Sequence, residues 1–345
     1  GRGHERRRGG KTSKKARRLR PAAEGDRMKA TKLAGQTGLR QKNPLLRSII
    51  KNRYIYLMLL PVVAFYVIFS YVPMYGIVLA WKNYRHTMGI LGSPWVGWEN
   101  FEVVFRNAGM VPAIRNTIVI SLLKLVICFP APIILALLLN EVTSRIFKRS
   151  AQTIVYLPNF ISWVIIGGLV KTMFAIDDGL VNNILEAMGI GRINFLLDSR
   201  YFYFLLIGSE LWKSTGWGTV IYIAAISGID PTLYEAAKID GCKRFGLVRF
   251  ITFPCILPII AVMLIMQISN IMNAGFDSVY NLYNKTVYDV ADIIDTLVYR
   301  LGVSDGEIEQ STAVGLFKNV INFILLLTGN WLTKKMCGYS MYSLD

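Results

Sequence analysis

Long apolar segments constrain this chain more than any other feature of its sequence. A helix that rises 1.5 Å per residue needs about 20 apolar residues to cross the hydrocarbon core of a bilayer. With 53% hydrophobic residues among 345 and a mean hydropathy of +0.40, the chain is too apolar for a soluble domain of its size. We therefore predict an all-α membrane protein, one bundle of six transmembrane helices over residues 54–81, 113–140, 151–175, 201–229, 255–274 and 313–332.

Basic residues indicate how the predicted spans are oriented. The formal net charge is +17, and Lys and Arg are densest between Arg2 and Arg53. Lys and Arg near span ends resist translocation. We therefore predict that the cytoplasmic side holds this segment, the loops after the second and fourth spans, and Lys334-Lys335. Both termini are then cytoplasmic. Beside a membrane span, the basic tail is interpreted as a contact for lipid headgroups and not for nucleic acid. Residues 1–27 are predicted to be disordered, and Met28 is an alternative start.

Motifs for common enzyme chemistry are absent from the sequence. Gly10-Lys11-Thr12 imitates the end of a phosphate-binding loop, but Glu5 stands where the first glycine of that loop belongs. His4 and His86 are too few for a metalloprotease, and the four cysteines have neither a zinc spacing nor a disulfide framework. No G-x-S-x-G nucleophile motif occurs. We therefore expect no enzymatic activity, no bound cofactor and no metal site in this chain.

The loop between the fourth and fifth predicted spans has helical start and stop signals of its own. Asp230-Pro231 is typical of a helix start, because Asp accepts hydrogen bonds from free amide groups and Pro tolerates the first helical position. Gly241 is expected to end this helix in the left-handed conformation. A second short helix is predicted over 242–253, stopped by Pro254. On spacing alone, the loop is also compatible with an amphipathic linker lying on the membrane.

Six residues of this loop carry a resemblance to a known family. They are Glu235, Ala236, Ala237, Gly241, Ile251 and Pro254. Their spacing resembles the EAA loop of binding-protein-dependent ABC importer permeases of type I, and Phe253 is the one departure, since the family usually has leucine there. The resemblance implies a coupling element in which the two alanines let the helix sit in a cleft of a separate ATPase subunit. Glu235 would then supply a polar anchor, and Gly241 would set the bend.

The resemblance extends over residues 51–344 and favours a carbohydrate-uptake branch, similar to maltose and lipoprotein-dependent polysaccharide transporter permeases. Prolines and polar residues inside spans need a specific reason in lipid, which makes the matching segments informative. They are Asn52-Arg53-Tyr54 with Leu59-Leu60-Pro61 and Pro73-Met74-Tyr75-Gly76; Arg115-Asn116-Thr117 with Phe129-Pro130-Ala131-Pro132 and Leu138-Leu139-Asn140-Glu141; and Tyr156-Leu157-Pro158. The implied cargo is a carbohydrate, an oligosaccharide in particular.

The same resemblance implies partners, a location and a division of the chain. The expected partners are ABC ATPase subunits that bind the ATP, a second homologous permease in a heterodimer, and an extracellular solute-binding lipoprotein. The expected location is the bacterial cell membrane, with multiple spans. Residues 1–50 are expected to form the basic cytoplasmic tail, 51–335 the transmembrane permease domain with the coupling loop at 230–254, and 336–345 a short cytoplasmic tail.

Polar residues inside the predicted spans are candidates for a substrate pathway, because such groups at membrane depth face protein or water. The candidate set is Glu210, Trp217, Gln267, Asn270 and Asn273. Two alternatives stay open: Glu210 and Lys213 form an intrahelical pair, and Trp217 is an interfacial anchor. The acidic loop over 289–309 is a candidate docking surface for the binding protein, with a merely solvated loop as the alternative.

Other function classes remain at this point. A secondary transporter should show internal hydropathy symmetry, and a membrane sensor or scaffold would need a soluble signalling domain; neither is visible in the sequence. An ABC permease for a non-sugar solute also stays open, because the coupling loop does not identify the cargo.

Overall fold

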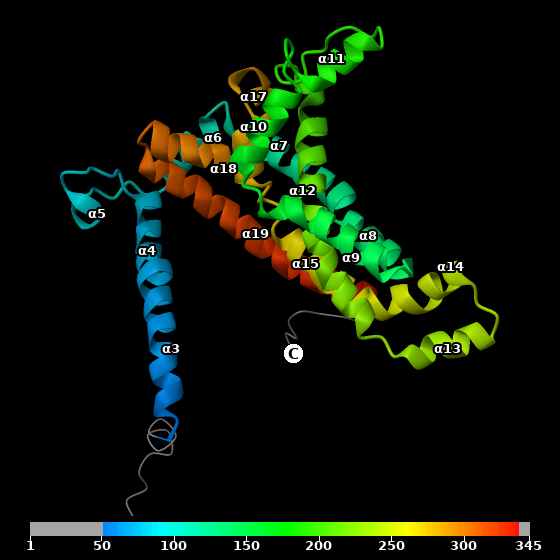
Figure 1. Cartoon of the computed structure of the whole chain (residues 1–345). Helices are drawn as coiled ribbons and strands as arrows, with labels where there is room; N and C mark the ends of the chain where they lie inside the picture. Colours follow the sequence, from blue (N-terminus) through cyan, green and yellow to red (C-terminus); the bar gives the residue numbers. More distant parts are fainter. Residues whose placement is uncertain (1–50, 338–345) are drawn as a thin grey trace, which may run out of the picture. The chain divides into compact units, whose positions relative to one another are not determined.

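A computed structural model describes residues 51–337, which form helices joined by loops (Figure 1). Within this range the extended pairing is limited to one bridge between Lys82 and Trp95, so the predicted all-α class is confirmed. The predicted tail over 1–50 and most of the tail predicted over 336–345 lie outside the described residues. The chain divides into two units, one ending at Val72 and the other beginning at Pro73.

The described part of the first unit is an apolar helix. Helix α3 (Arg53–Tyr66) continues into a π-helical turn, η1 (Val67–Tyr71), and neither element contains a buried residue. A helix that is apolar on all sides needs lipid or another protein around it, as expected for the first predicted span. Pro61 lies inside α3 without ending it.

The elements that follow complete the described chain. They are α4 (Val72–Met74), η2 (Tyr75–Trp81), α5 (Gly89–Gly92), α6 (Glu99–Arg106), α7 (Met110–Leu123), η3 (Lys124–Cys128), α8 (Pro130–Glu141), α9 (Arg145–Tyr156), η4 (Leu157–Phe160), α10 (Trp163–Met173), α11 (Leu180–Ala187), α12 (Ser199–Ser227), α13 (Pro231–Ile239), α14 (Arg244–Leu247), η5 (Val248–Thr252), α15 (Phe253–Ser269), α16 (Phe276–Leu282), η6 (Lys285–Val287), α17 (Tyr288–Ala291), α18 (Ile294–Tyr299), η7 (Arg300–Ser304) and α19 (Ile308–Cys337).

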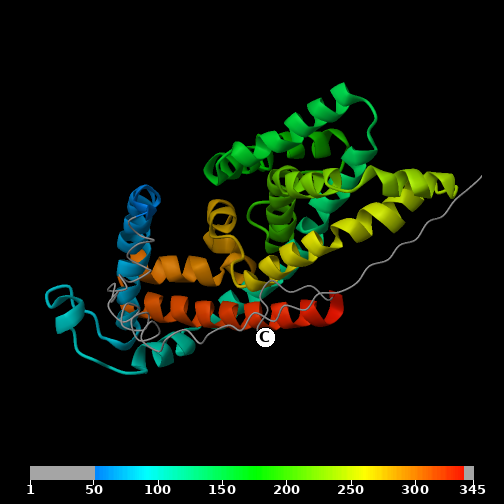
Figure 2. The same ribbon diagram turned by 90° about the horizontal axis from the view of Figure 1, so that it is seen from below.

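Helix α12 is the centre of the second unit. Helix α8 packs along it, and the two backbones approach closely because glycines face the contact. A Cβ atom at Gly218 would lie 2.9 Å from Pro132, and one at Gly216 would lie 2.0 Å from the carbonyl oxygen of Val155 in α9. Helix α19 packs against α15 and α18, and Figure 2 shows α18 folded back beside α19.

Four described helices are long and apolar enough to cross a membrane, or five if one bent pair counts as a single span. The four are Arg53–Trp81, Met110–Glu141, Arg244–Ser269 and Ile308–Trp331. The bent pair, Arg145–Phe160 with Trp163–Met173, turns by 99°, so the third predicted span is not one straight helix. Helix α12 is 29 residues long, but Glu210, Lys213 and a run of small polar residues lower its hydropathy. The six-span count therefore stays a prediction.

Two of the predicted spans break at polar positions. Between η4 and α10 the backbone becomes extended at Ile161, and Ser162 then caps α10 by accepting a hydrogen bond from the amide of Ile165 at 3.4 Å. Helix α15 ends at Ser269, five residues short of the predicted end, and Gly275 has a φ of +92° before α16. Both breaks place non-helical backbone inside an apolar segment, which is tolerated only where protein or water surrounds it.

Candidate functional site

The loop between α12 and α15 begins with the predicted capped helix. The Asp230 carboxylate accepts a hydrogen bond from the amide of Thr232 at 2.9 Å, and Pro231 occupies the first position of α13. That backbone hydrogen bond lowers the pKa of Asp230 below its usual value. Helix α13 thus starts where the local sequence predicts it.

Gly241 ends α13 in the left-handed conformation, with a φ of +80°. The amide of Cys242 donates to the carbonyl oxygen of Ala237 at 2.9 Å, and the amide of Gly241 donates to that of Lys238 at 3.1 Å. These two bonds form a Schellman motif, which satisfies the last carbonyl groups of the helix. The predicted role of Gly241 as the helix end is borne out by this geometry.

The predicted stop at Pro254 is wrong. Helix α14 runs through the π-helical turn η5 directly into α15, so Arg244–Ser269 is one continuous helix. Pro254 lies in the first turn of α15, where the wider turn before it accommodates a residue that lacks an amide hydrogen. The hydroxyl groups of Tyr234 and Thr252 lie 3.0 Å apart and join α13 to this helix.

The six residues of the EAA pattern face mostly outward. Glu235, Ala236, Gly241 and Pro254 are exposed, whereas Ala237 and Ile251 are half-buried. Nearby on α13, the side chain of Ile239 is 86% exposed. Figure 1 shows α13 and α14 projecting from the end of α12. The loop is therefore a protrusion whose apolar and small residues are available to a partner.

Glu210 forms a long-range ion pair, and the alternative of an intrahelical pair with Lys213 is wrong. Its Oε2 atom lies 2.7 Å from Nζ of Lys124 in η3. Lys124 Nζ also donates to the hydroxyl oxygen of Ser278 in α16 at 3.1 Å. The pair therefore ties α12 to the π-helical turn of α7–α8 and to α16. Glu210 pairs with Lys124, 86 positions away in the sequence, and not with Lys213, three positions away.

Lys213 instead donates hydrogen bonds to backbone carbonyl groups at the break in the third predicted span. Its Nζ donates to the carbonyl oxygen of Asn159 at 2.9 Å and to that of Ile161, and it lies 5.7 Å from the ring centre of Trp163. These carbonyl groups are freed where η4 ends and α10 has not begun. A cation inside the apolar layer is thereby held by backbone dipoles.

A polar hollow of about 440 Å³ surrounds this break. It is lined by Asn159, Phe160, Ile161, Ser162, Trp163, Val164, Lys213, Asp277 and Asn281. The set combines hydroxyl, amide and charged groups with an indole ring, which are the groups that hold the hydroxyls and apolar face of a sugar. Asn159, Ser162, Asp277 and Asn281 were not among the sequence candidates. The Pro158-Asn159 pair inside an apolar run was the signal that could have found Asn159 and Ser162, whereas Asp277 and Asn281 come from the distant helix α16 and have no such local signal.

The other residues predicted to line the substrate pathway lie in two separate regions, on α12 and at the end of α15. Trp217 is 53% exposed, stands one turn after Lys213 on α12, and meets the edge of Phe160 at 6.1 Å between ring centres. Gln267, Asn270 and Asn273 are exposed at and just beyond the end of α15, and the Asn270 amide donates to the carbonyl oxygen of Met266 at 2.9 Å. None of these three lines the polar hollow, and their role stays a prediction.

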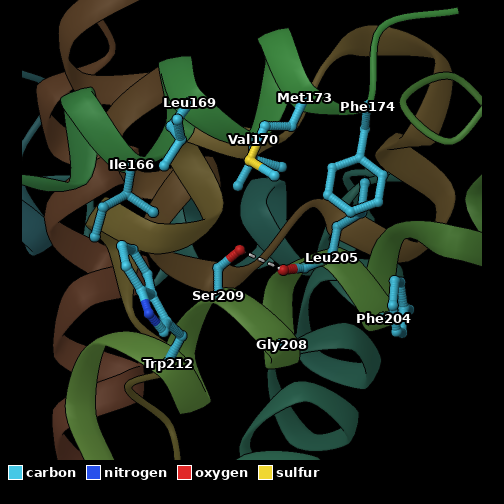
Figure 3. A pocket seen from close by; sticks show the side chains of 10 residues that line it. All are labelled: Ile166, Leu169, Val170, Met173, Phe174, Phe204, Leu205, Gly208, Ser209 and Trp212. Atoms are coloured by element: carbon cyan, nitrogen blue, oxygen red, sulfur yellow. Dashed lines mark hydrogen bonds between the residues drawn. The ribbon is translucent and has the colours of Figure 1, made fainter. Parts of the chain in front are cut away.

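A second cleft, between α10 and α12, is apolar. Its volume is about 320 Å³, and Figure 3 shows side chains such as Leu169, Met173 and Phe204 around it. The hydroxyl of Ser209 is used within α12, where it donates to the carbonyl oxygen of Leu205 at 2.6 Å. This cleft offers a sugar no free polar group from Ser209, so the polar hollow is the better pathway candidate. Among residues 51–337, no group of three or more His, Cys, Asp or Glu side chains could hold a metal.

Long apolar helices, polar breaks inside them and a projecting helix-turn-helix define a membrane transport component. Residues 129–336 match the family described as "Binding-protein-dependent transport system inner membrane component", and the chain belongs to this family.

Similar proteins agree with this assignment. The chain is 43% identical to the polygalacturonan/rhamnogalacturonan transport system permease protein YteP of Bacillus subtilis (strain 168), over 88% of this chain and 94% of that protein. It is 40% identical to Protein LplB of the same organism, over 83% and 90%. Among solved structures, a bacterial ABC transporter involved in the import of the acidic polysaccharide alginate has a TM-score of 0.79 at 39% identity, covering 85% of this chain and 99% of the matched chain.

Proposed function

We propose that this chain is the membrane-spanning permease subunit of an ATP-driven ABC importer for a carbohydrate, specifically an oligosaccharide. The observation that carries the proposal is the 43% identity to a polygalacturonan/rhamnogalacturonan permease over 94% of that protein's length. The likeness to a polysaccharide importer of solved structure supports the same cargo class. An ABC permease for a non-sugar solute is the second candidate, since a relative 26% identical to this chain is a transport permease for sn-glycerol-3-phosphate.

The partners follow from the family and from one solved relative. That relative, 38% identical, was solved in complex with an alginate-pentasaccharide-bound periplasmic protein. By analogy, an extracellular solute-binding protein delivers the sugar to this chain, a second homologous permease completes the pathway, and ABC ATPase subunits bind and hydrolyse ATP. We expect no enzymatic activity and no bound cofactor in this chain, because the ATP would be bound by the ATPase subunits.

Six spans with both termini in the cytoplasm remain part of the proposal. Five spans satisfy the criteria of length and composition if the bent pair is one span, and α12 supplies a sixth. Its 29 residues extend about 43 Å at 1.5 Å per residue, more than the roughly 30 Å of hydrocarbon. Its polar middle faces the polar hollow and the Lys124–Glu210 pair, so the polar residues do not require lipid contact.

Coupling to the ATPase is assigned to Glu235, Ala236, Ala237, Gly241, Ile251 and Pro254. The support is their placement on a protrusion with small, exposed residues and a well-defined Schellman end at Gly241. Small side chains permit close approach of the α13 backbone to a cleft, and Tyr234–Thr252 joins α13 to the continuous helix that enters the membrane. A displacement of α13 is then passed to α15 as a rigid-body movement.

The test is uptake by the complete transporter in proteoliposomes: this chain with a second permease, an ATPase and a solute-binding protein of the same transport system. We expect ATP-dependent accumulation of labelled oligogalacturonide in the presence of the binding protein. An ATPase variant that binds but does not hydrolyse ATP is the control and should give none. Accumulation driven by an ion gradient without ATPase would favour a secondary transporter. Uptake of sn-glycerol-3-phosphate but no oligosaccharide would favour the non-sugar candidate.

A further inference from the structure

The cation that lines the polar hollow is already occupied. Lys213 carries three N–H donors. Its Nζ donates to the carbonyl oxygens of Asn159 and Ile161, and it lies 5.7 Å from the ring centre of Trp163. Among the described residues that line the hollow, Lys213 is the one Lys or Arg. These residues therefore offer no uncommitted cation to the carboxylate of an acidic sugar.

The anion that lines the hollow, Asp277, is unpaired. Its backbone carbonyl oxygen accepts a hydrogen bond from the Asn281 amide group at 2.8 Å, but its exposed carboxylate has no hydrogen bond or ion pair to any residue in 51–337. An ionised carboxylate only accepts hydrogen bonds. It can therefore bind the hydroxyl groups of a sugar, which donate, and it repels a second carboxylate.

Two close contacts fix helix α16, which carries Asp277, beside the hollow. A Cβ atom at Gly167 of α10 would lie 2.9 Å from both Cβ and the carbonyl oxygen of Asn281, so a larger residue there would displace α16. The Ser278 hydroxyl also lies 3.1 Å from Nζ of Lys124. Asp277 and Asn281 are four residues apart on one helical face, and both line the hollow. The backbone that carries the unpaired carboxylate is therefore held in place.

We propose that Asp277 is a specificity-determining residue that makes the polar hollow prefer an uncharged sugar ring to a uronate; this inference rests on the proposed function. A neutral ring presents hydroxyl groups to the carboxylate and adds no charge. A uronate adds a second negative charge in a region where surrounding protein makes Coulomb repulsion stronger than in bulk water. The preference is compatible with uptake of oligogalacturonide, because it concerns the relative affinity for the acidic and the neutral form.

Asp277 also has a possible structural role, which the experiment must separate from selectivity. It lies in the first turn of α16, where the helix dipole favours a carboxylate. Loss of that stabilisation would affect every cargo alike. Trigalacturonide and its fully methyl-esterified form share the same rings and linkages, and only the first carries carboxylates. The ratio of KM for the acidic form to KM for the ester therefore reports on charge selection.

The test measures uptake of both labelled trisaccharides by the complete transporter in proteoliposomes. The binding protein also selects its sugar, so the same binding protein is used throughout and the change in the KM ratio between variants is compared. Asp277→Asn removes the charge and nearly keeps the size of the side chain. We expect the KM ratio to fall about tenfold in this variant, mainly because KM for the acidic form falls.

Two control variants separate charge in the hollow from other effects. Asp277→Glu keeps the charge and should keep the wild-type KM ratio. Asp178→Asn removes an exposed carboxylate that does not line the hollow, and it should also leave the ratio unchanged. A fall of the ratio in Asp178→Asn equal to that in Asp277→Asn would assign the effect to the general charge of the protein and overturn the role of Asp277.

The remaining outcomes distinguish this inference from the proposed function. An unchanged KM ratio in Asp277→Asn, or an equal loss of uptake for both trisaccharides, would overturn the selectivity of Asp277 while leaving the proposed function intact. If the wild-type transporter with its ATPase and binding protein takes up no oligosaccharide, acidic or neutral, the proposed function is overturned and the inference falls with it.

Discussion

Nζ of Lys124 lies 2.7 Å from Oε2 of Glu210, and the two side chains are only 10% and 20% exposed. The pair joins a π-helical turn to the middle of α12, and the hydroxyl of Ser278 brings α16 into the same cluster. In a poorly solvated site, each charge depends on the other, since an unpaired buried ion is far more costly than a neutral group. The pair therefore specifies how three elements meet.

Removing one member of this pair should destabilise the protein strongly. In Lys124→Met, Glu210 is left without its cation, and we expect a loss of about 3 kcal/mol. The double variant Lys124→Met/Glu210→Met should recover most of that loss, because neither charge then remains in the apolar region. Thermal unfolding of the purified protein in detergent measures both effects.

The matched control is the surface pair between Glu102 and Arg106, which are 65% and 83% exposed at 3.5 Å. Arg106→Met should change the unfolding temperature little, because exposed pairs contribute about 0–1 kcal/mol. Equal destabilisation by Lys124→Met and Arg106→Met would contradict the structural role of the Lys124–Glu210 pair.

Local signals predicted the start and end of α13, and long-range contacts account for what sequence missed. Asp230 and Gly241 act through hydrogen bonds to residues within five positions, so the local sequence is enough to predict their roles. The partner of Glu210 is 86 positions away, and nothing nearby identifies it. Pro254 looked like a stop because the wider turn before it, which lets the helix continue, has no clear sequence signature.

Gly241→Asp should abolish ATP-driven uptake while the protein stays in the membrane at a normal level. An added Cβ atom would meet nothing within 4 Å in this chain, so the chain itself can accommodate the side chain at the cost of about 1–2 kcal/mol of backbone strain. A docked ATPase would instead meet a new charge at a close contact. Uptake of labelled sugar and immunoblotting of membranes measure the two quantities.

Gly97→Asp is the control for Gly241→Asp. Gly97 has a φ of +65° and also has nothing within 4 Å of an added Cβ atom, so backbone strain and free space are matched. We expect uptake to persist in this variant. Loss of uptake in both variants to the same extent would attribute the effect to strain and remove the argument for docking at Gly241.

Asp230 should make the first turn of α13 sensitive to acid. Its pKa is lowered in the folded loop by the hydrogen bond from the Thr232 amide, so the ionised cap stabilises the helix above the unfolded pKa of about 3.9. This stabilisation is lost as the pH falls through the lower, folded value. Hydrogen exchange of the α13 amides should lose protection in that acidic range. In Asp230→Asn, which keeps a cap but cannot ionise, protection in this turn should not follow the same titration; an identical pH profile would exclude Asp230 as its cause.

The two candidate pathway regions can be separated by uptake kinetics. Asn159 lines the polar hollow beside Lys213, and Asn159→Ala should raise the KM for oligosaccharide uptake roughly 3- to 10-fold, as expected for the loss of one hydrogen bond. Asn270→Leu/Asn273→Leu tests the end of α15 and should alter affinity or range if those residues also meet the sugar. Asn83→Ala, an exposed change in the loop after η2, is the control and should leave KM unchanged. If KM rises only in Asn270→Leu/Asn273→Leu, the polar hollow is excluded as the sugar pathway and the end of α15 is favoured.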